Sequence, residues 1–543
     1  MKRILAVLLT LALVASLGIS SAFAEDFADG KFTATQKLTV EVYNRYNDGG
    51  TDPTSSVYAQ YIHDGMLEKY NIDVEFVSVG RWSEVDDIGN LLAAGQAPDV
   101  CVTYSYPTIL TYAEMGGIVD LNEPLTQYKD ELTNLWNLLE DYNIYYDQDP
   151  ETGTLWCVEA RLANNARINT FIREDWLNKL GLAIPTTEEE FENCLIAFRD
   201  NAETLLGADA DKMIPFLSTT DIGWMCNQVI TSHVAEDISD ETAYVYGYDS
   251  RQILYPGAKE GVRTLNKWYN EGLMWKDFVL NDSDQADNLI KSGWVGAFGH
   301  NYDYPYRNGE DSIQASIQRA AGPDAAFVAI EPFTNDAGIP RKFLSDRVDR
   351  KCFLPATCSN VHAALLYLDY ISDPEVIKFL QVGEEGIVHE VTEDGAYRLL
   401  TMSDEDRAVW IQNSLNNIDH TITVNGQYLG DATVASLALG YAGVDPKYIT
   451  IAYETAMNQG RVVAKFSVGA IASENEVGSS LDSYRDTWLD QAVVASVEEF
   501  DSVYDSCQNE YLNSMGGQEI INERAEKLKD VYGVEVPTDL LTK

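Results

Sequence analysis

Cysteine is sparse in this sequence of 543 residues, which holds seven cysteines and no Cys-x-x-Cys pair. They stand far apart, at Cys101, Cys157, Cys194, Cys226, Cys352, Cys358 and Cys507. An odd number of widely spaced cysteines argues against a disulfide framework and against a zinc site. We therefore expect buried free thiols, with a Cys352–Cys358 disulfide as the less favoured alternative.

Basic residues are scarce as well. The chain has 38 Lys and Arg against 86 Asp and Glu, a formal net charge of -48 at pH 7. Such an acidic surface repels nucleic acid and anionic membranes and favours solubility. The charge therefore argues against a nucleic-acid partner, although it does not bear on the fold.

The motifs that carry common enzyme chemistry are missing. The sequence has no G-x-x-x-x-G-K-[ST] phosphate loop, no G-x-S-x-G elbow and no G-x-G-x-x-G fingerprint. His389-Glu390 begins like a zinc motif, but Glu393 stands where the second histidine belongs. Adjacent acids such as Glu384-Glu385 are expected by composition in so acidic a chain. We therefore expect no catalytic residue and no enzymatic activity.

A calcium loop is matched only at its start. Asp147, Asp149 and Glu151 suit the first ligand positions. Thr152, however, replaces the glycine of the sharp turn, and Val158 replaces the closing bidentate glutamate. The sequence therefore predicts no bound metal and no cofactor.

The N-terminus has the pattern of an export signal. Lys2 and Arg3 precede an apolar run over residues 4–19, and Ala22-Phe23-Ala24 has the small-x-small form of a cleavage site. The run falls short of the roughly 20 apolar residues that span a membrane. We expect residues 1–24 to be removed and the protein to be exported, extracellular or periplasmic. The first cysteine is Cys101, so this signal offers no lipid-anchoring cysteine.

Strand and helix patterns alternate from residue 37 to residue 104. Residues 37–43, 72–79 and 100–104 read as strands, and helical faces lie between them. Ser83-x-x-Asp86 predicts a capping box for the second of these helices. This alternation predicts parallel strands joined by crossover helices, with ligand-binding groups beyond the carboxyl ends of the strands.

The alternation resumes further along the chain. Residues 153–172 predict two extended segments, Thr187-x-x-Glu190 caps a helix, and residues 294–300 form an apolar strand. Residues 353–380 predict a strand and two helices, and the chain after about residue 480 is mostly helical. About 520 mature residues are too many for one core, so we expect at least two lobes.

Three runs resemble a known family. LLAAGQAPDV (residues 91–100), YAEMGGIVDL (112–121) and FIREDWLNKLGLAIPTTEEEF (171–191) are similar to segments of the extracellular solute-binding proteins of ABC importers, the family of the maltose-binding protein. The form of the third run and the length are similar to the long sugar receptors of Firmicutes, which usually carry the lipid-anchoring cysteine that this chain lacks.

The resemblance implies an α/β, two-lobed periplasmic-binding-protein fold of type II, each lobe a mainly parallel sheet flanked by helices. It places residues 25–165 and 350–420 in lobe one, and residues 166–349 and 421–543 in lobe two. It also implies a monomer that binds a small-molecule solute between the lobes and delivers it to the transmembrane subunits of an ABC permease.

Aromatic platforms and fixed hydrogen-bonding groups are what a sugar site needs. Ten tryptophans and 31 tyrosines supply the platforms. The predicted ligand-binding residues are Asn47, Trp82, Tyr104, Tyr106, Arg167, Asn169, Trp224, His300, Asn301 and Tyr302. We expect an oligosaccharide, first of all a neutral one, while Arg161, Arg167 and Arg173 keep an acidic sugar open. A peptide-binding receptor of the same fold and a secreted glycoside hydrolase are the alternatives.

Overall fold

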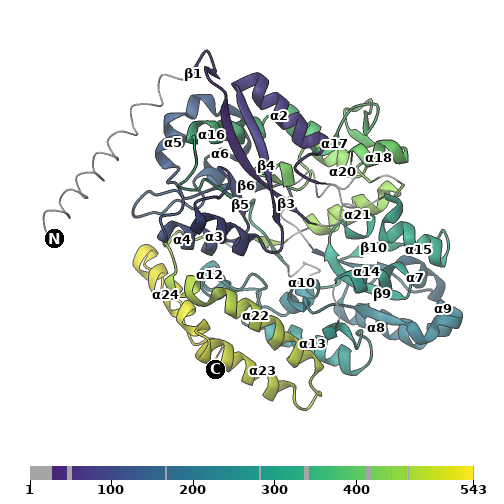
Figure 1. Cartoon of the computed structure of the whole chain (residues 1–543). Coiled ribbons are helices and arrows are strands. Elements are labelled where there is room, and N and C mark those ends of the chain that lie inside the picture. The colour runs from purple at the N-terminus through teal and green to yellow at the C-terminus, as the bar shows by residue number, and fades with distance from the viewer. Residues whose placement is uncertain are drawn as a thin grey trace.

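The chain forms two lobes in the computed structural model (Figure 1), each built around a large hydrophobic core, and a small third cluster lies on elements of the first lobe. The structure describes residues 27–45, 52–164, 168–280, 283–307, 309–334, 342–410, 419–441, 443–458, 460–462 and 464–541. The predicted export signal, Asn47 and Arg167 lie outside these ranges. No helix in the described ranges is long and apolar enough to cross a membrane.

The first lobe begins with the predicted strand and helix alternation. Its elements are β3 (Gln36–Asn44), α2 (Val57–Tyr70), β4 (Ile72–Gly80), α3 (Glu84–Ala94) and β5 (Cys101–Thr103). β3 and β4 pair in parallel over their whole length. Val100 donates its amide to the Thr39 carbonyl, and Glu41 donates to Val100, so the segment leading into β5 continues the sheet in parallel. The predicted parallel arrangement of these three strands is confirmed.

Two longer connections complete the first sheet. β12 (Val348–Phe353) pairs antiparallel with β5 and with β6 (Val158–Leu162), and β15 (Val424–Asn425) pairs parallel with β6. Ile422 and Val424 are buried in the first core. The first lobe therefore extends past residue 420, where we expected the chain to cross. The other lobe boundaries stay a prediction.

Helices surround the first sheet. They are α4 (Tyr106–Glu114), α5 (Asn122–Gln127), α6 (Thr133–Ile144), α16 (Val361–Tyr370), α17 (Pro374–Val382) and α18 (Asp404–Trp410). Every residue of α16 but its first is buried, because this helix lies inside the lobe and is apolar nearly all round. Small two-stranded ribbons, β1 (Phe27–Ala28) with β2 (Lys31–Phe32) and β13 (His389–Val391) with β14 (Tyr397–Leu399), complete the lobe.

The second lobe is built on a four-stranded sheet in the order β10-β7-β9-β8. The strands are β7 (Ile168–Arg173), β8 (Ile214–Leu217), β9 (Val295–Asn301) and β10 (Phe327–Ile330). Only the β8–β9 pair is parallel. This sheet is therefore mostly antiparallel, contrary to the mainly parallel sheet that we expected in each lobe.

Helices also surround the second sheet, and the shortest of them, α10, lies beside β9. They are α7 (Glu174–Leu180), α8 (Glu188–Asp200), α9 (Ala202–Leu206), α10 (Ile222–Met225), α11 (Asn227–Ser232), α12 (Asp240–Tyr246), α13 (Ala258–Asn270), α14 (Ser283–Lys291), α15 (Ile313–Ala321) and α21 (Pro446–Met457). α20 (Thr433–Leu437) contacts β14 of the first lobe. The two short strands β11 (Phe343–Leu344) and β16 (Arg461–Val462) pair with each other in parallel.

Three helices end the chain, as predicted. α22 (Ala472–Val494), α23 (Phe500–Asn509) and α24 (Gly517–Tyr532) lie along the lower left of Figure 1, in yellow. Trp488 of α22 is fully buried in the second core, and α22 packs against α13. α22 also contacts α4 of the first lobe. The C-terminal helices therefore belong to the second lobe and reach the first.

One of the two predicted helix caps is wrong. Thr187 caps α8 as expected, because its hydroxyl accepts the Glu190 amide at 3.2 Å. Ser83 instead donates its hydroxyl to the Asp87 carboxylate at 2.6 Å and makes no side-chain cap on α3. The acidic first turn of α3 offers that competing carboxylate, which sequence spacing alone does not reveal.

Candidate functional site

A stack of aromatic rings around one arginine lies at the carboxyl ends of β3, β4 and β5. The guanidinium carbon of Arg81 is 4.0 Å from the ring centre of Tyr104, 4.9 Å from that of Trp82 and 5.2 Å from that of Tyr43. Tyr43 and Tyr104 are stacked with ring centres 6.2 Å apart. Trp82 is 79% exposed, so one aromatic ring of this aromatic stack faces solvent.

Glu84 holds the aromatic stack in place. Its carboxylate accepts from Arg81 Nη1 at 2.9 Å and from the Thr103 hydroxyl at 2.9 Å. Glu84 is buried at the start of α3, so one carboxylate ties the ends of β4 and β5 to that helix. Our sequence analysis missed Glu84, although its i,i+3 spacing from Arg81 is a signal for such a pair.

The neighbouring strand end carries a second charged pair. Arg45 donates to both carboxylate oxygens of Asp419, at 2.7 and 2.8 Å. Asp419 is buried, so this bidentate contact fixes the end of β3 against a segment far along the chain.

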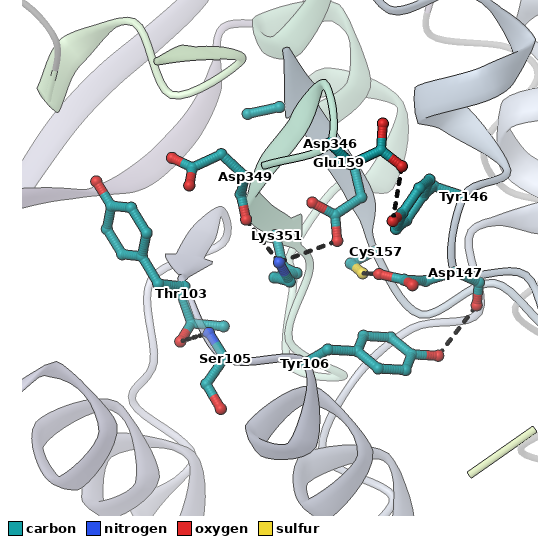
Figure 2. Close-up of polar contacts among 12 residues, drawn as sticks. Thr103, Ser105, Tyr106, Tyr146, Asp147, Cys157, Glu159, Asp346, Asp349 and Lys351 are labelled. Atoms are coloured by element: carbon teal, nitrogen blue, oxygen red, sulfur yellow. Dashed lines mark hydrogen bonds and ion pairs between the residues drawn. The ribbon is translucent and has the colours of Figure 1, made fainter. Parts of the chain in front are cut away.

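Tyr106 belongs to a different group of polar residues, shown in Figure 2. Its hydroxyl donates to the Asp147 carbonyl at 3.0 Å. The side chains of Lys351, Glu159, Cys157 and Asp147 point toward one another behind it. We call these four residues the polar cluster. Lys351 Nζ lies 3.2 Å from the Glu159 carboxylate.

Charges in the polar cluster offset one another. Burial, and the neighbouring Asp147, raise the pKa of Glu159 well above its ordinary value. Burial acts in the same sense on Asp147, but its hydrogen bond with Glu159 and the charges of Lys465 and Lys351 lower its pKa overall. Lys465 Nζ lies 2.5 Å from Asp147 and 3.4 Å from the centre of the Tyr146 ring.

Among the described residues, Asp147, Cys157 and Glu159 form a group of side chains of the kinds that bind metal ions, and they lie close enough together to hold one. Their ligand atoms are all within 4.8 Å of each other. Burial raises the pKa of the Cys157 thiol well above its ordinary value, which opposes the thiolate that a metal needs. Lys351 and Lys465 already bring positive charge to this place. The absence of a metal stays a prediction.

In the second lobe, His300, Asn301 and Tyr302 lie at the end of β9 and are half-buried. The His300 ring stacks on Tyr304 with ring centres 3.4 Å apart, and its Nδ1 accepts the Asn301 amide at 2.8 Å. Burial and the nearby Arg307 lower the pKa of His300 to about 3. His300 is therefore neutral at physiological pH and can exchange hydrogen bonds with hydroxyl groups.

Trp224 stands on α10, next to the same end of β9. The guanidinium carbon of Arg251 lies 5.1 Å from the Trp224 ring centre. α10 approaches β9 so closely that a Cβ on Gly299 would lie 1.9 Å from the Met225 carbonyl oxygen. Glycine at 299 is therefore what allows α10, and with it Trp224, to sit at this strand end.

Asn169 has a packing role in the structure. It is completely buried in β7, and its amide donates to the Ala452 carbonyl of α21 at 2.8 Å. We expected an amide on the wall of the binding site. The structure shows this contact to α21, and a part for Asn169 in ligand binding stays a prediction.

The predicted residues therefore form three groups. Trp82 and Tyr104 meet in the aromatic stack, Tyr106 stands beside the polar cluster, and the second lobe contributes Trp224 with His300, Asn301 and Tyr302. In Figure 1, the lower ends of β3 and β4 point toward α10. The aromatic groups of the first lobe thus lie at the carboxyl ends of its parallel strands, where open α/β sheets bind their ligands, and those of the second lobe lie at the end of β9.

This chain has the fold of the type II periplasmic solute-binding proteins, so the resemblance and the two-lobed α/β fold class predicted from the sequence are confirmed, apart from the parallel sheet expected in the second lobe. It is similar to the calcium-free alginate-binding protein AlgQ2, with a TM-score of 0.63 and 14% identity over 92% of this chain and 99% of that one. An extracellular solute-binding protein from Bifidobacterium longum subsp. infantis gives a TM-score of 0.62 and 17% identity over 95% of this chain and 100% of that one.

Among characterised sequences, the chain is similar to the polygalacturonan/rhamnogalacturonan-binding protein YtcQ of Bacillus subtilis (strain 168). The two are 22% identical over 469 residues, which cover 84% of this chain and 86% of the relative. The chain matches no protein-family model.

Proposed function

We propose that this protein is the substrate-binding component of an ABC importer, which captures a sugar or oligosaccharide between its lobes and delivers it to a membrane permease. The aromatic stack carries the proposal. An exposed indole on a rigid support offers the flat apolar face on which the C–H groups of a sugar ring pack. The strand-end position agrees with where this fold class binds ligands.

The similar proteins support a carbohydrate over a peptide. The Bacillus relative is named for binding polygalacturonan and rhamnogalacturonan, and AlgQ2 is named for alginate. A peptide bound as an added strand would need unpaired backbone hydrogen-bonding groups on the protein. The aromatic stack instead presents rings and side-chain charges, which suit a sugar.

We further propose that the protein releases its ligand unchanged. A glycoside hydrolase needs two carboxyl groups that face each other across the substrate, one of them with a raised pKa. Asp147 and Glu159 are two neighbouring carboxyl groups, and the pKa of Glu159 is raised. Both are buried, however, and each contacts a lysine. These contacts suit a structural role. Export to the cell surface or periplasm, and action as a monomer, belong to the same proposal.

Isothermal titration calorimetry tests the proposal. The mature protein would be titrated with neutral and acidic plant and bacterial oligosaccharides, and in parallel with mixed short peptides. We expect one-to-one binding of at least one oligosaccharide and no heat from peptides. Binding of peptides without any saccharide would overturn the carbohydrate assignment and leave the fold class intact.

A further inference from the structure

We infer that this site selects uncharged oligosaccharides over uronic-acid oligosaccharides, because the cations beside it that the structure describes are already neutralised by the protein's own carboxylates. The inference rests on the proposed function and narrows its ligand class. In the described part of the site, each cation adjacent to a candidate residue faces an acidic partner. The pairs are Arg45–Asp419, Arg81–Glu84, Arg251–Asp221, Arg307–Asp303 and Lys351–Glu159.

Arg81 is the cation nearest to the aromatic stack, and it is covered from several sides. The Tyr104 and Trp82 rings lie at 4.0 and 4.9 Å from its guanidinium carbon, and Glu84 accepts from its Nη1 at 2.9 Å. A uronate carboxylate would have to compete with Glu84 for the same guanidinium. Since Glu84 is buried, displacing Arg81 from it would leave a buried charge without its counter-ion.

Arg45 is held more firmly still. Both of its contacts to Asp419 are short, at 2.7 and 2.8 Å, and they use the two-pronged geometry that guanidinium offers to a carboxylate. Asp419 already makes the two-pronged contact to Arg45 that a uronate carboxylate would need. This strand end therefore presents a neutral unit to a ligand.

The second lobe repeats the arrangement. Arg307 donates to Asp303 at 2.6 and 2.9 Å, next to the His300 ring. Arg251, which covers Trp224, lies 3.3 Å from Asp221. The His300 Nε2 and the Asn301 side-chain amide are then the groups that we expect to hydrogen-bond to hydroxyls, since the Asn301 backbone amide already donates to His300 Nδ1.

The charge of the whole chain acts in the same direction. At -48, the surface repels a polyanion over distances up to the Debye length, which is about 10 Å at 0.1 M salt. An uncharged glycan is not affected by this field. The short-range pairing and the long-range repulsion therefore favour the same class of ligand.

Calorimetry with matched ligands tests the inference. Oligogalacturonides would be compared as free acids and as full methyl esters of equal length, together with neutral galactan, arabinan, xylan and mannan oligosaccharides, at low and at physiological salt. We expect at least one uncharged ligand to bind with an affinity that salt barely changes, and the free acids to bind at least about tenfold more weakly than any uncharged counterpart that binds.

The opposite result is equally clear. Free acids that bind more tightly than their esters, with an affinity that falls as salt rises, would show that a cation of the site takes the carboxylate. That outcome would overturn the inference but support the proposed function. Binding of peptides and of no saccharide would instead overturn the proposed function itself.

Two variants probe the neutralisation directly. Glu84→Gln keeps the shape of the side chain but removes the charge that faces Arg81, so the ratio of free-acid to ester affinity should rise by about tenfold. Glu75→Gln is the matched control, because Glu75 is exposed on β4, the strand that leads to Arg81, and its loss changes the net charge equally. It should leave the ratio unchanged.

Asp221→Asn is a second test of the inference, which still applies if Glu84→Gln fails to fold. Asp221 is 46% exposed and faces Arg251 beside Trp224, so its replacement frees a cation in the other lobe at little risk to the core. The affinity ratio should again rise. An unchanged ratio in both folded variants, checked by circular dichroism, would contradict the inference.

Discussion

The Lys465 ammonium lies 2.5 Å from an Asp147 carboxylate oxygen and joins the two lobes. Phe466, the next residue, packs against the second core, whereas Tyr145 packs against the first. Only 26% of the Lys465 side chain and 7% of the Asp147 side chain are exposed, so water screens the pair weakly. Lys465 also bonds the Tyr146 carbonyl. This contact links the segment before the C-terminal helices to the polar cluster.

Lys465→Met should lower the free energy of unfolding by about 1–3 kcal/mol at neutral pH. Complete loss of one partner from a buried pair costs about 3–5 kcal/mol, and Lys351 reduces that here by staying near Asp147. The effect is fully present at neutral pH, because a lowered carboxyl pKa stabilises the fold above the unfolded value of about 3.9. Urea denaturation measures it.

Lys529→Met is the matched control. Lys529 pairs with Glu535 on the surface, where both side chains are more than half exposed. Water screens such an exposed pair, so its loss should hardly change the free energy of unfolding. Equal losses in the two variants would show that the Lys465 contact is no stronger than a surface pair.

His300 should make the protein less stable as the pH falls below about 6.5. The imidazole pKa is about 3 in the fold and about 6.5 in the unfolded chain, so the unfolded chain binds more protons between these values. Stability then falls with pH, by about 1–2 kcal/mol between about pH 6.5 and pH 5. Between the same two pH values, the stability of the His300→Gln variant should fall by about 1–2 kcal/mol less than that of the parent protein. Identical pH profiles for parent and variant would disprove a buried neutral His300.

Trp82→Ala should weaken sugar binding by about ten- to hundredfold, because it removes the exposed ring of the aromatic stack. The melting temperature of the ligand-free protein should hardly change, since the side chain is 79% exposed. Trp82→Phe keeps an aromatic face and should recover most of the affinity. A large drop in stability with intact affinity would place Trp82 outside the binding site.

Gly299→Ala should destabilise the protein by about 1–3 kcal/mol or more, because the added methyl group would collide with the Met225 carbonyl oxygen. Gly89→Ala provides the contrast. Gly89 lies inside helix α3, and a Cβ there would meet the Tyr112 ring at an ordinary 3.8 Å. That change should stabilise the fold by about 0.5–1 kcal/mol. Comparable melting temperatures for the two variants would contradict the close approach of α10 to β9.

Much of the fold could be predicted from the sequence because its signals are local. The strands at 37–43 and 72–79 alternate apolar and polar residues, and Gly95 and Gly181 end their helices in the left-handed conformation that favours glycine. Parallel pairing of β3 with β4 follows from the crossover helix between them. The antiparallel pairings of β12 and β10 were not predicted, because they join segments distant in the sequence.

The candidate site was predicted only where it follows from strand ends. Trp82 and Tyr104 come together because β4 and β5 end at the same edge of the sheet. Nothing local links Arg45 to Asp419, which stand 374 residues apart. The burial of Asn169 was missed for a related reason, since the helix that accepts its hydrogen bond comes 283 residues later.

The most direct test of the central claim is recovery of an intact ligand. The mature protein would be incubated with an oligosaccharide that binds in calorimetry and passed over a size-exclusion column, and the bound sugar would be released by denaturation and chromatographed. The account predicts one oligosaccharide of unchanged length per protein molecule, and a free pool that is also unchanged after prolonged incubation. Shortened or rearranged sugars in molar excess over the protein would contradict it, because they would show an enzyme where we propose a receptor.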